Sequence, residues 1–369
     1  MTDPRIVKQA KVLVDYSLKV KKGDRVLILS DILGYPLVKE IYRLLVRRGA
    51  KEIRLHFDSY ELEEIFYREA SKETLRTFPK ISMDEMKQID CWIGVRCEAN
   101  TRGLSGVDSS RMAERLKVVR PIINWRVAKT RWVITNFPVD SQAQEADMSL
   151  AEYEDFVFSA INNVDWGRLK SKQEKLRRIV NKVKRVRILS KNTDLEFSIS
   201  GRKALNGDGE NNMPDGEVFT SVVENSTEGI ITFTYPAIYM GREFHEVSLT
   251  FKKGRVVKAS ALKKESDLNK ILDMDKGARA VGEFGIGNNF RITKFTKDIL
   301  FDEKIGGSIH LALGNGYTES LSKNISALHW DMICDLRAPA SAKATSRQGG
   351  ELWFDDKLVQ KNGKWLLKL

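Results

Sequence analysis

Cysteines and long apolar runs are both scarce in this 369-residue chain, and each scarcity excludes a class of protein. Cys91, Cys97 and Cys334 are too few for a disulfide framework, which favours a reducing compartment. Their spacing matches no zinc knuckle, so we expect buried small side chains. No apolar run approaches the roughly 20 residues that cross a bilayer, and the first residues do not resemble a secretion signal. The composition therefore predicts a cytoplasmic protein without a membrane partner.

The net charge of +12 is the one compositional feature that suggests a nucleic-acid partner. Lysine and arginine are spread along the chain, however, and acidic residues are interspersed with them. The one dense basic stretch is 170–191, where Leu176, Ile179 and Val183 recur at helical spacing. We interpret its basic residues as the solvated face of an amphipathic helix and expect no nucleic-acid partner.

A chain of this length suits two domains, and strand-like and helix-like runs alternate in its first half. Such alternation predicts a doubly wound α/β domain with a parallel sheet. The predicted strands are 25–29, 52–57, 89–95 and 118–124. The predicted helices are 3–18, 37–48, 60–77, 150–162 and the basic helix, while 125–146 shows no regular pattern.

The pattern changes near Val186, where short β-rich runs separated by turn signals begin. Asn362-Gly363 is one such hairpin signal, and 337–350 is rich in small residues and predicts a loop. We therefore expect an N-terminal α/β domain over 1–185. A β-rich α+β domain follows over 186–369.

Several common catalytic motifs are missing. The sequence has no Walker motif, no HExxH and no GxSxG nucleophile elbow. Gly282, Gly285 and Gly287 do not have the spacing of a dinucleotide fingerprint. These absences remove several enzyme classes without identifying another.

Two of the four histidines lie close together late in the chain. In 326–336 one strand face is wholly apolar, and the other carries His329 and Asp331 side by side, a metal-ligand pair. His310 lies in a similar strand, where Ser308 and Ala312 leave space beside it for an ion, and the following turn presents Tyr317. For each histidine alone a structural role is the simpler interpretation; the pair favours a metal site.

The carboxylates are too numerous for composition to choose among them. Glu217 follows a Pro-Asp-Gly turn, and Glu283 lies in a glycine-rich segment. Glu303 precedes Gly306-Gly307 and is as good a candidate as Glu283 from the residues alone.

Three ordered segments resemble signatures of the aminopeptidase T family, also called thermophilic or AmpS-type aminopeptidases. They are Asn-Met-Pro-Asp-Gly-Glu-Val-Phe-Thr at 212–220, Leu-Phe-Asp-Glu-Lys-Ile-Gly-Gly-Ser-Ile-His-Leu-Ala-Leu-Gly at 300–314 and Asn-Ile-Ser-Ala-Leu-His-Trp-Asp at 324–331. The opening residues 3–26 and the segments 100–102 and 104–108 are also similar, so the resemblance covers essentially the whole chain.

The resemblance implies an exopeptidase with a dinuclear metal site in the C-terminal domain, usually in a homodimer. Carried over by motif, it implies Glu217, Glu283, His310, His329 and Asp331 as metal ligands, and it favours Glu283 over Glu303. It also implies a role for the tyrosine seven positions after His310, which is Tyr317. The expected ions are two divalent metals, zinc or cobalt, with manganese as a further candidate.

This ligand set fits two-metal hydrolysis of a peptide with a free N-terminus, where a metal-bound water attacks the scissile carbonyl. Our hypothesis gives Glu217 or Glu283 the additional task of moving the proton, and Tyr317 a hydrogen bond to the oxyanion. Another two-metal hydrolase, such as a dipeptidase or an esterase, uses the same ligands and is the alternative. A non-enzymatic nucleic-acid-binding protein is a third hypothesis, which the ligand set disfavours.

Overall fold

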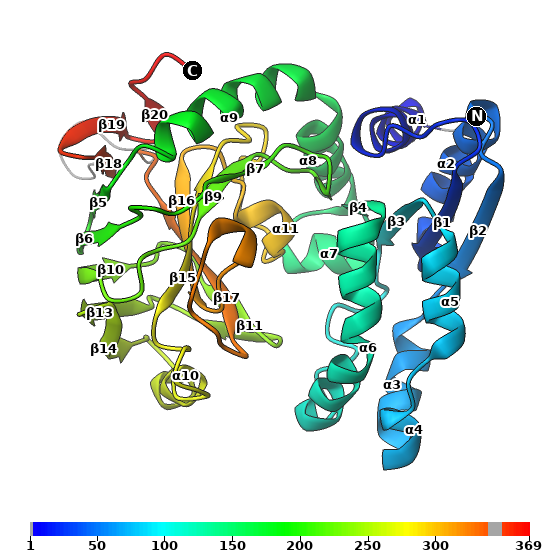
Figure 1. Cartoon of the computed structure of the whole chain (residues 1–369), viewed down its shortest axis with the longest axis horizontal. Helices are drawn as coiled ribbons and strands as arrows, with labels where there is room; N and C mark the ends of the chain where they lie inside the picture. The colour runs from blue at the N-terminus through cyan, green and yellow to red at the C-terminus, as the bar shows by residue number, and fades with distance from the viewer. Residues whose placement is uncertain (1–2, 339–348) are drawn as a thin grey trace. The chain divides into compact units, whose positions relative to one another are not determined.

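The computed structural model describes residues 3–338 and 349–369, which fold into two compact units (Figure 1). The first unit comprises Met1–Val164 with Gly209–Pro214, and the second comprises Asp165–Asp208 with Asp215–Leu369. The division falls after Val164 and not near 186, because the basic helix α9 (Trp166–Val180) belongs with the second unit. Most of the loop predicted at 337–350 lies outside the described residues.

The first unit is built around a five-stranded parallel sheet in the order β2-β1-β3-β4-β8. Its strands are β1 (Arg25–Ser30), β2 (Glu52–Phe57), β3 (Cys91–Arg96), β4 (Arg131–Asn136) and β8 (Asn212–Met213). Its helices are α1 (Pro4–Lys11), α2 (Tyr35–Arg48), α3 (Tyr60–Glu69), α4 (Lys72–Arg76), α5 (Lys80–Gln88), α6 (Ser109–Lys129), α7 (Asp140–Glu145) and α8 (Leu150–Asn162). A π-helical segment (Val12–Ser17) extends α1, and a 3-10 turn (Ile32–Gly34) precedes α2.

The prediction of a strand at 118–124 is wrong, because that segment lies inside helix α6. Asp108 caps this helix through the backbone N–H of Ser110, and Ile122 and Trp125 pack at helical spacing against a core of Leu27, Met86, Ile89 and Trp92. The segment 125–146 is also more regular than expected, since it contains β4 and α7.

Two antiparallel sheets dominate the second unit, and both contribute to its core. The larger has the order β14-β13-β10-β6-β5-β18-β19-β20 and the smaller has the order β17-β16-β15-β9-β7. The bounds in the larger are β5 (Arg185–Ser190), β6 (Thr193–Ser198), β10 (Glu228–Thr232), β13 (Ser248–Lys252), β14 (Arg255–Ser260), β18 (Glu351–Phe354), β19 (Lys357–Lys361) and β20 (Lys364–Trp365). Those in the smaller are β7 (Leu205–Gly207), β9 (Glu217–Thr220), β15 (Val281–Gly287), β16 (Ser308–Gly314) and β17 (His329–Asp335).

Shorter elements complete the second unit. They are the ribbon β11 (Ala237–Tyr239) and β12 (Arg242–Phe244), the helices α10 (Glu265–Leu272) and α11 (Ile299–Asp302), and a 3-10 turn (Thr318–Ser320). Apolar residues of both large sheets form one core, in which the rings of Phe197 on β6 and Phe284 on β15 meet with centroids 5.1 Å apart. One face of the smaller sheet therefore packs in the core, and its other face is available for polar residues.

The predicted fold class, an α/β unit with a parallel sheet followed by a β-rich unit, is confirmed. Helix α8 begins as expected at Ser149, whose hydroxyl and Glu152 form a reciprocal capping box. Within the described ranges, we find no helix whose length and apolar content would let it cross a bilayer.

Candidate metal centre

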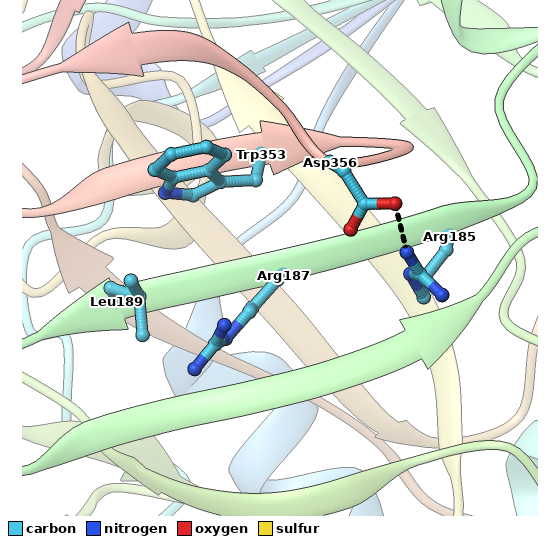
Figure 2. Close-up of a pocket in the computed structure, with 5 residues that line it drawn as sticks. All are labelled: Arg185, Arg187, Leu189, Trp353 and Asp356. Carbon is cyan, nitrogen blue, oxygen red and sulfur yellow. Dashed lines mark hydrogen bonds and ion pairs between the residues drawn. The ribbon is translucent and has the colours of Figure 1, made fainter.

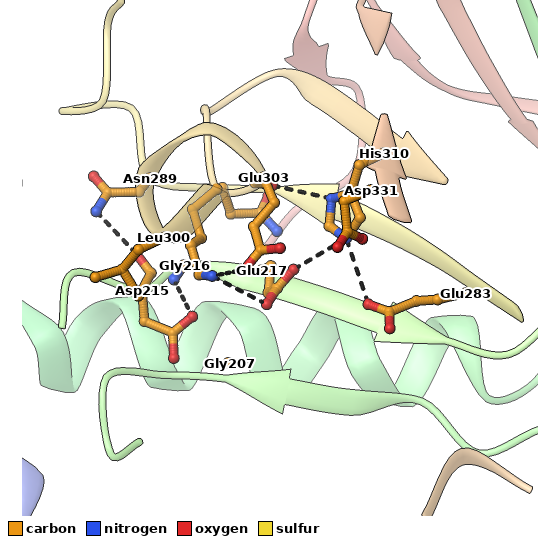
Figure 3. Close-up of polar contacts among 12 residues, drawn as sticks. Gly207, Asp215, Gly216, Glu217, Glu283, Asn289, Leu300, Glu303, His310 and Asp331 are labelled. Carbon is orange, nitrogen blue, oxygen red and sulfur yellow. Dashed lines mark hydrogen bonds and ion pairs between the residues drawn. The ribbon is translucent and has the colours of Figure 1, made fainter. Parts of the chain in front are cut away.

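A cluster of carboxylates and imidazoles lies on the smaller sheet of the second unit. Figure 3 shows four of its members, Glu217, Glu283, His310 and Asp331. Glu217 opens β9, Glu283 lies on β15, His310 lies on β16, and His329 and Asp331 lie on β17. These four strands are consecutive neighbours in the sheet. The antiparallel order thus brings together residues that are more than a hundred positions apart in sequence.

Strand alternation explains why these side chains leave the core. On β16 the side chains of Ile309 and Leu311 enter the core, so His310 between them points to the opposite face. Gly285 lies directly across from His310 on β15. A Cβ atom at Gly285 would lie 2.0 Å from the imidazole Cε1, so only glycine leaves room for the ring.

His310 is fully buried and has one nitrogen directed at the carboxylates. Its Nδ1 lies 3.1 Å from the backbone carbonyl of Glu303, which can only accept, so Nδ1 carries the proton. The Nε2 atom lies 3.3 Å from Glu217 Oε2 and 3.4 Å from Glu283 Oε1. A backbone carbonyl that holds one ring nitrogen and frees the other is the usual arrangement of a metal-binding histidine.

His329 has the same arrangement. Its Nδ1 lies 2.8 Å from the carbonyl oxygen of Asn315, in the turn after β16. Its Nε2 lies 3.4 Å from Asp331 Oδ2 and 4.0 Å from Glu283 Oε2. The two imidazoles therefore approach Glu283 from two sides through equivalent nitrogens, and each also faces a carboxylate of its own, Glu217 for His310 and Asp331 for His329.

Three buried carboxylate oxygens of the cluster accept no hydrogen bond from the described residues. They are Glu217 Oε2, Glu283 Oε2 and Asp331 Oδ1. Buried polar atoms nearly always have partners, and an unpaired buried carboxylate is costly. The ligand atoms of Glu217, Glu283 and His310 lie within 4.8 Å of one another, so a shared cation would satisfy them. Oxygen and imidazole donors in this arrangement fit a divalent metal.

Burial and mutual charge shift the pKa values of Glu283, His310, His329 and Asp331. Burial raises the pKa of Glu283, and the neighbouring Asp331 adds to that rise. Burial alone would lower the pKa of His329, but Asp331 outweighs it and raises the value to about 10. Burial likewise opposes ionisation of Asp331, yet His329 lowers its pKa to about 2. His310 has a raised pKa because its carboxylate neighbours outweigh its burial.

Glu303 and Lys304 add a fourth carboxylate and a cation to the cluster. The ligand atoms of Glu303, His310 and Asp331 also lie within 4.8 Å of one another. The side chain of Lys304 is fully buried; its Nζ contacts Glu303 and lies 3.6 Å from Glu217 Oε1. The structure thus brings both Glu283 and Glu303 to the cluster. Lys304 was missed, because nothing in the sequence distinguishes it from the many solvated lysines.

Tyr317 stands at the edge of the cluster. Its ring meets the ring of His329 with centroids 5.5 Å apart and that of Phe219 with centroids 5.6 Å apart. Burial raises the pKa of its hydroxyl, and Glu283 and Asp331 raise it further. The hydroxyl therefore stays protonated and available as a donor.

Other histidines and pockets lie away from this cluster. His56 and His245 each face one glutamate, at 3.2 Å and 3.3 Å. A shallow pocket of about 210 Å³ on the larger sheet is lined by Arg185, Arg187, Leu189, Trp353 and Asp356 (Figure 2). Arg185 pairs with Asp356, and Arg187 pairs with Asp194, so its cations are already neutralised.

Comparison with known proteins identifies the family. The sequence profile of the thermophilic metalloproteases (M29) matches residues 2–365. The chain belongs to the M29 family. This M29 chain is 25% identical over 358 residues to aminopeptidase 2 of Geobacillus stearothermophilus, covering 86% of this chain and 85% of that protein. It is 26% identical to aminopeptidase PepS of Streptococcus thermophilus, covering 85% and 84%.

Solved structures share the fold of the M29 chain. AmpT from Thermus thermophilus superposes with a TM-score of 0.85 at 20% identity, covering 99% of both chains. A 2,5-dihydroxypyridine dioxygenase from Pseudomonas putida superposes at 0.63 with 13% identity, covering 98% and 97%. Since one fold supports two chemistries, the family match and not the fold shows a metal-dependent peptide hydrolase. The predicted family and enzyme class are confirmed.

Proposed function

We propose that this M29 enzyme is an aminopeptidase that holds two divalent ions between Glu217, Glu283, His310, His329 and Asp331. The observation that carries the proposal is the convergence of two carbonyl-held imidazoles on three buried carboxylates, each with one oxygen that accepts no hydrogen bond from the described residues. The two relatives described above match 86% and 85% of this chain, and both are named aminopeptidases, which supports the same activity here. Zinc or cobalt is the proposed metal, with manganese as a further candidate.

The chemistry divides between the ions and the chain. Held by these residues, two divalent ions would supply Lewis acidity for the scissile carbonyl and would bring the pKa of a bound water toward about 7. From the chain, Glu217 or Glu283 takes the proton of the attacking water and returns it to the leaving amine. The C–N bond breaks as that amine is protonated, so the products are an amino acid and a shortened peptide.

Tyr317 donates a hydrogen bond to the oxyanion that develops during attack. The proposal is supported by the position of its ring against His329 and by its raised pKa, which keeps the proton on the hydroxyl. A hydrogen-bond donor that is already positioned where negative charge develops lowers the activation barrier, because it does not have to reorganise during the reaction.

The acidity of the cluster supports recognition of a free N-terminus. The carboxylates of Glu217, Glu283, Glu303 and Asp331 outnumber the cationic side chains of Lys304 and His329 beside them. A substrate ammonium group adds positive charge next to the scissile bond. A peptide with a blocked terminus lacks that charge and loses this interaction.

Hydrolysis of leucine p-nitroanilide, compared with its N-acetyl derivative, tests the proposal. We expect turnover of the first and none of the second. A parallel series of di-, tri- and pentapeptides separates an aminopeptidase from a dipeptidase, because only the former cleaves the longer peptides. Equal rates on free and acetylated substrates, or activity confined to dipeptides, would refute aminopeptidase activity.

Two further proposals concern the whole enzyme. We propose a cytoplasmic homodimer, supported by the family resemblance and, for the compartment, by three unpaired cysteines. Light scattering should give twice the chain mass of 42.1 kDa; a monomer mass would exclude the dimer.

A further inference from the structure

Lys304 is the buried group of the metal centre to which the proposed reaction gives no task. It follows helix α11 in a turn, and its side chain has no exposed surface. A fully buried lysine is rare because the ammonium loses its hydration, and it persists where carboxylates compensate it. Here its ammonium contacts the carboxylates of Glu303 and Glu217. These two glutamates are labelled in Figure 3.

The contacts of Lys304 divide the carboxylates of the cluster into two kinds. Its ammonium contacts Oε1 of Glu303 and of Glu217. The unpartnered oxygens, by contrast, belong to Glu217, Glu283 and Asp331, and Glu303 is not among them. The Lys304 ammonium therefore compensates the charge of Glu303 and contacts one carboxylate oxygen of Glu217. The other oxygen of Glu217 faces His310.

We propose that Lys304 is a resident counter-ion of the metal centre. It neutralises Glu303, which keeps that carboxylate from acting as a ligand, and it competes with the divalent ions for the charge of Glu217. It is a positioning residue, since its contacts are to carboxylates and not to substrate. The inference rests on the metal site of the proposed function.

The positive charge of Lys304 predicts how its removal changes the affinity for metal. A cation a few ångströms from a divalent ion opposes its binding, most strongly where water is excluded. Removing the ammonium should therefore tighten metal binding. It should also destabilise the metal-free protein, since buried carboxylates then repel one another without compensation.

Titration of chelator-stripped, full-length protein with Mn²⁺ by calorimetry measures this directly. We expect Lys304→Met to bind Mn²⁺ at least about tenfold more tightly than wild type. The matched control is Lys361→Met, which removes a lysine paired with Glu351 at 2.9 Å on the larger sheet. Its affinity for Mn²⁺ should equal that of wild type.

Two substitutions that together keep the net charge distinguish a counter-ion from a residue with only a structural role. Glu303→Gln alone should weaken Mn²⁺ binding, because Lys304 then turns fully to Glu217. The double variant Glu303→Gln with Lys304→Met keeps the wild-type net charge, and its affinity should return to within about threefold of wild type. A double variant that binds no better than the weaker single variant would overturn the proposal.

Folding gives a second readout. If Lys304→Met folds only with metal present, Lys304→Arg and the double variant should still fold when stripped, because their net charge is conserved. Loss of folding in all three would overturn the counter-ion role. Unchanged or weaker Mn²⁺ binding in Lys304→Met overturns this inference alone, whereas a wild-type chain that binds no divalent ion overturns the proposed function as well.

Discussion

At the residue scale, the hydrogen bonds of two imidazoles define the centre. His310 and His329 each donate through Nδ1 to a backbone carbonyl, of Glu303 and of Asn315, and both direct Nε2 at carboxylates. Removal of His310 should therefore reduce the metal content of the purified protein, by about one ion per chain. We expect His310→Ala to show this loss by mass spectrometry.

The chain supplies its own control for that measurement. His245→Ala removes a half-exposed imidazole that pairs with Glu243 outside the cluster, and it should leave the metal content unchanged. Equal metal content in the two variants would show that His310 is no ligand.

Tyr317 makes a separate contribution at the same scale. Tyr317→Phe keeps the ring that meets Phe219 and His329 but removes the proposed oxyanion donor. We expect kcat/KM for leucine p-nitroanilide to fall by roughly 10²–10³-fold, with metal content unchanged. A variant within a few-fold of wild type would exclude the oxyanion role.

The His329 pKa predicts how pH affects metal binding. Asp331 raises this pKa to about 10 in the metal-free protein, against 6.5 for a free histidine. The pair therefore stabilises the metal-free fold fully between pH 3.8 and pH 6.5. This contribution disappears as the pH rises through about 10, where His329 loses its proton, and as the pH falls through about 2, where Asp331 gains one. Because a metal must displace the same proton, apparent affinity should rise with pH over this window.

Calorimetry in buffers of different ionisation enthalpy counts that proton. At pH 8 we expect the wild-type chain to release about one proton more than His329→Gln on binding metal. An affinity that stays flat between pH 6.5 and 9 would show that His329 is already neutral or does not bind the metal.

At the element scale, close contact between β15 and β16 sets the position of His310. Gly285→Ala would place a methyl group 2.0 Å from the imidazole, so the ring must move and metal affinity should fall by about tenfold or more. Gly167→Ala is the matched control, because its Cβ would lie 3.6 Å from the nearest atom, Asp165 Oδ1. Unaltered affinity in Gly285→Ala would mean that the ring position does not matter for binding.

Strand alternation made this face of the smaller sheet predictable. Apolar residues alternate with His310 on β16 and with His329 and Asp331 on β17, and the structure places these three side chains away from the core. Their assignment as ligands stays a prediction. The choice of Glu283 came from the family resemblance, because glycine-rich surroundings alone gave it no advantage over Glu303.

The errors at this scale have physical causes. The segment 118–124 is rich in β-branched residues and reads as a strand, but Ile122 and Trp125 also fit a helical face, and packing on the first unit decides for helix. Strand β4 was missed because only Trp132, Val133 and Ile134 form its apolar run. A run of three residues is too short to indicate a buried strand.

At the scale of the whole molecule, each unit is built from two separate segments of the chain, which periodicity in the sequence cannot reveal. Residues 209–214 return to the first unit and add β8 beside β4, directly before Glu217 opens β9 in the second unit. A two-residue strand has no detectable period, so the sequence suggested a single boundary near 186. Along the chain, the residues between Met213 and Glu217 therefore connect a strand of the parallel sheet to a strand that carries one residue of the candidate metal centre.

The central claim is that the cluster on the smaller sheet acts through bound metal. The measurement that tests it is the rate of leucine p-nitroanilide hydrolysis against the number of ions bound per chain, in folded protein stripped by a chelator and reloaded with cobalt, zinc or manganese. The account predicts no turnover without metal and a rate that rises as up to two ions bind. Full turnover by metal-free protein, or none by folded protein with any of the three metals bound, would contradict it.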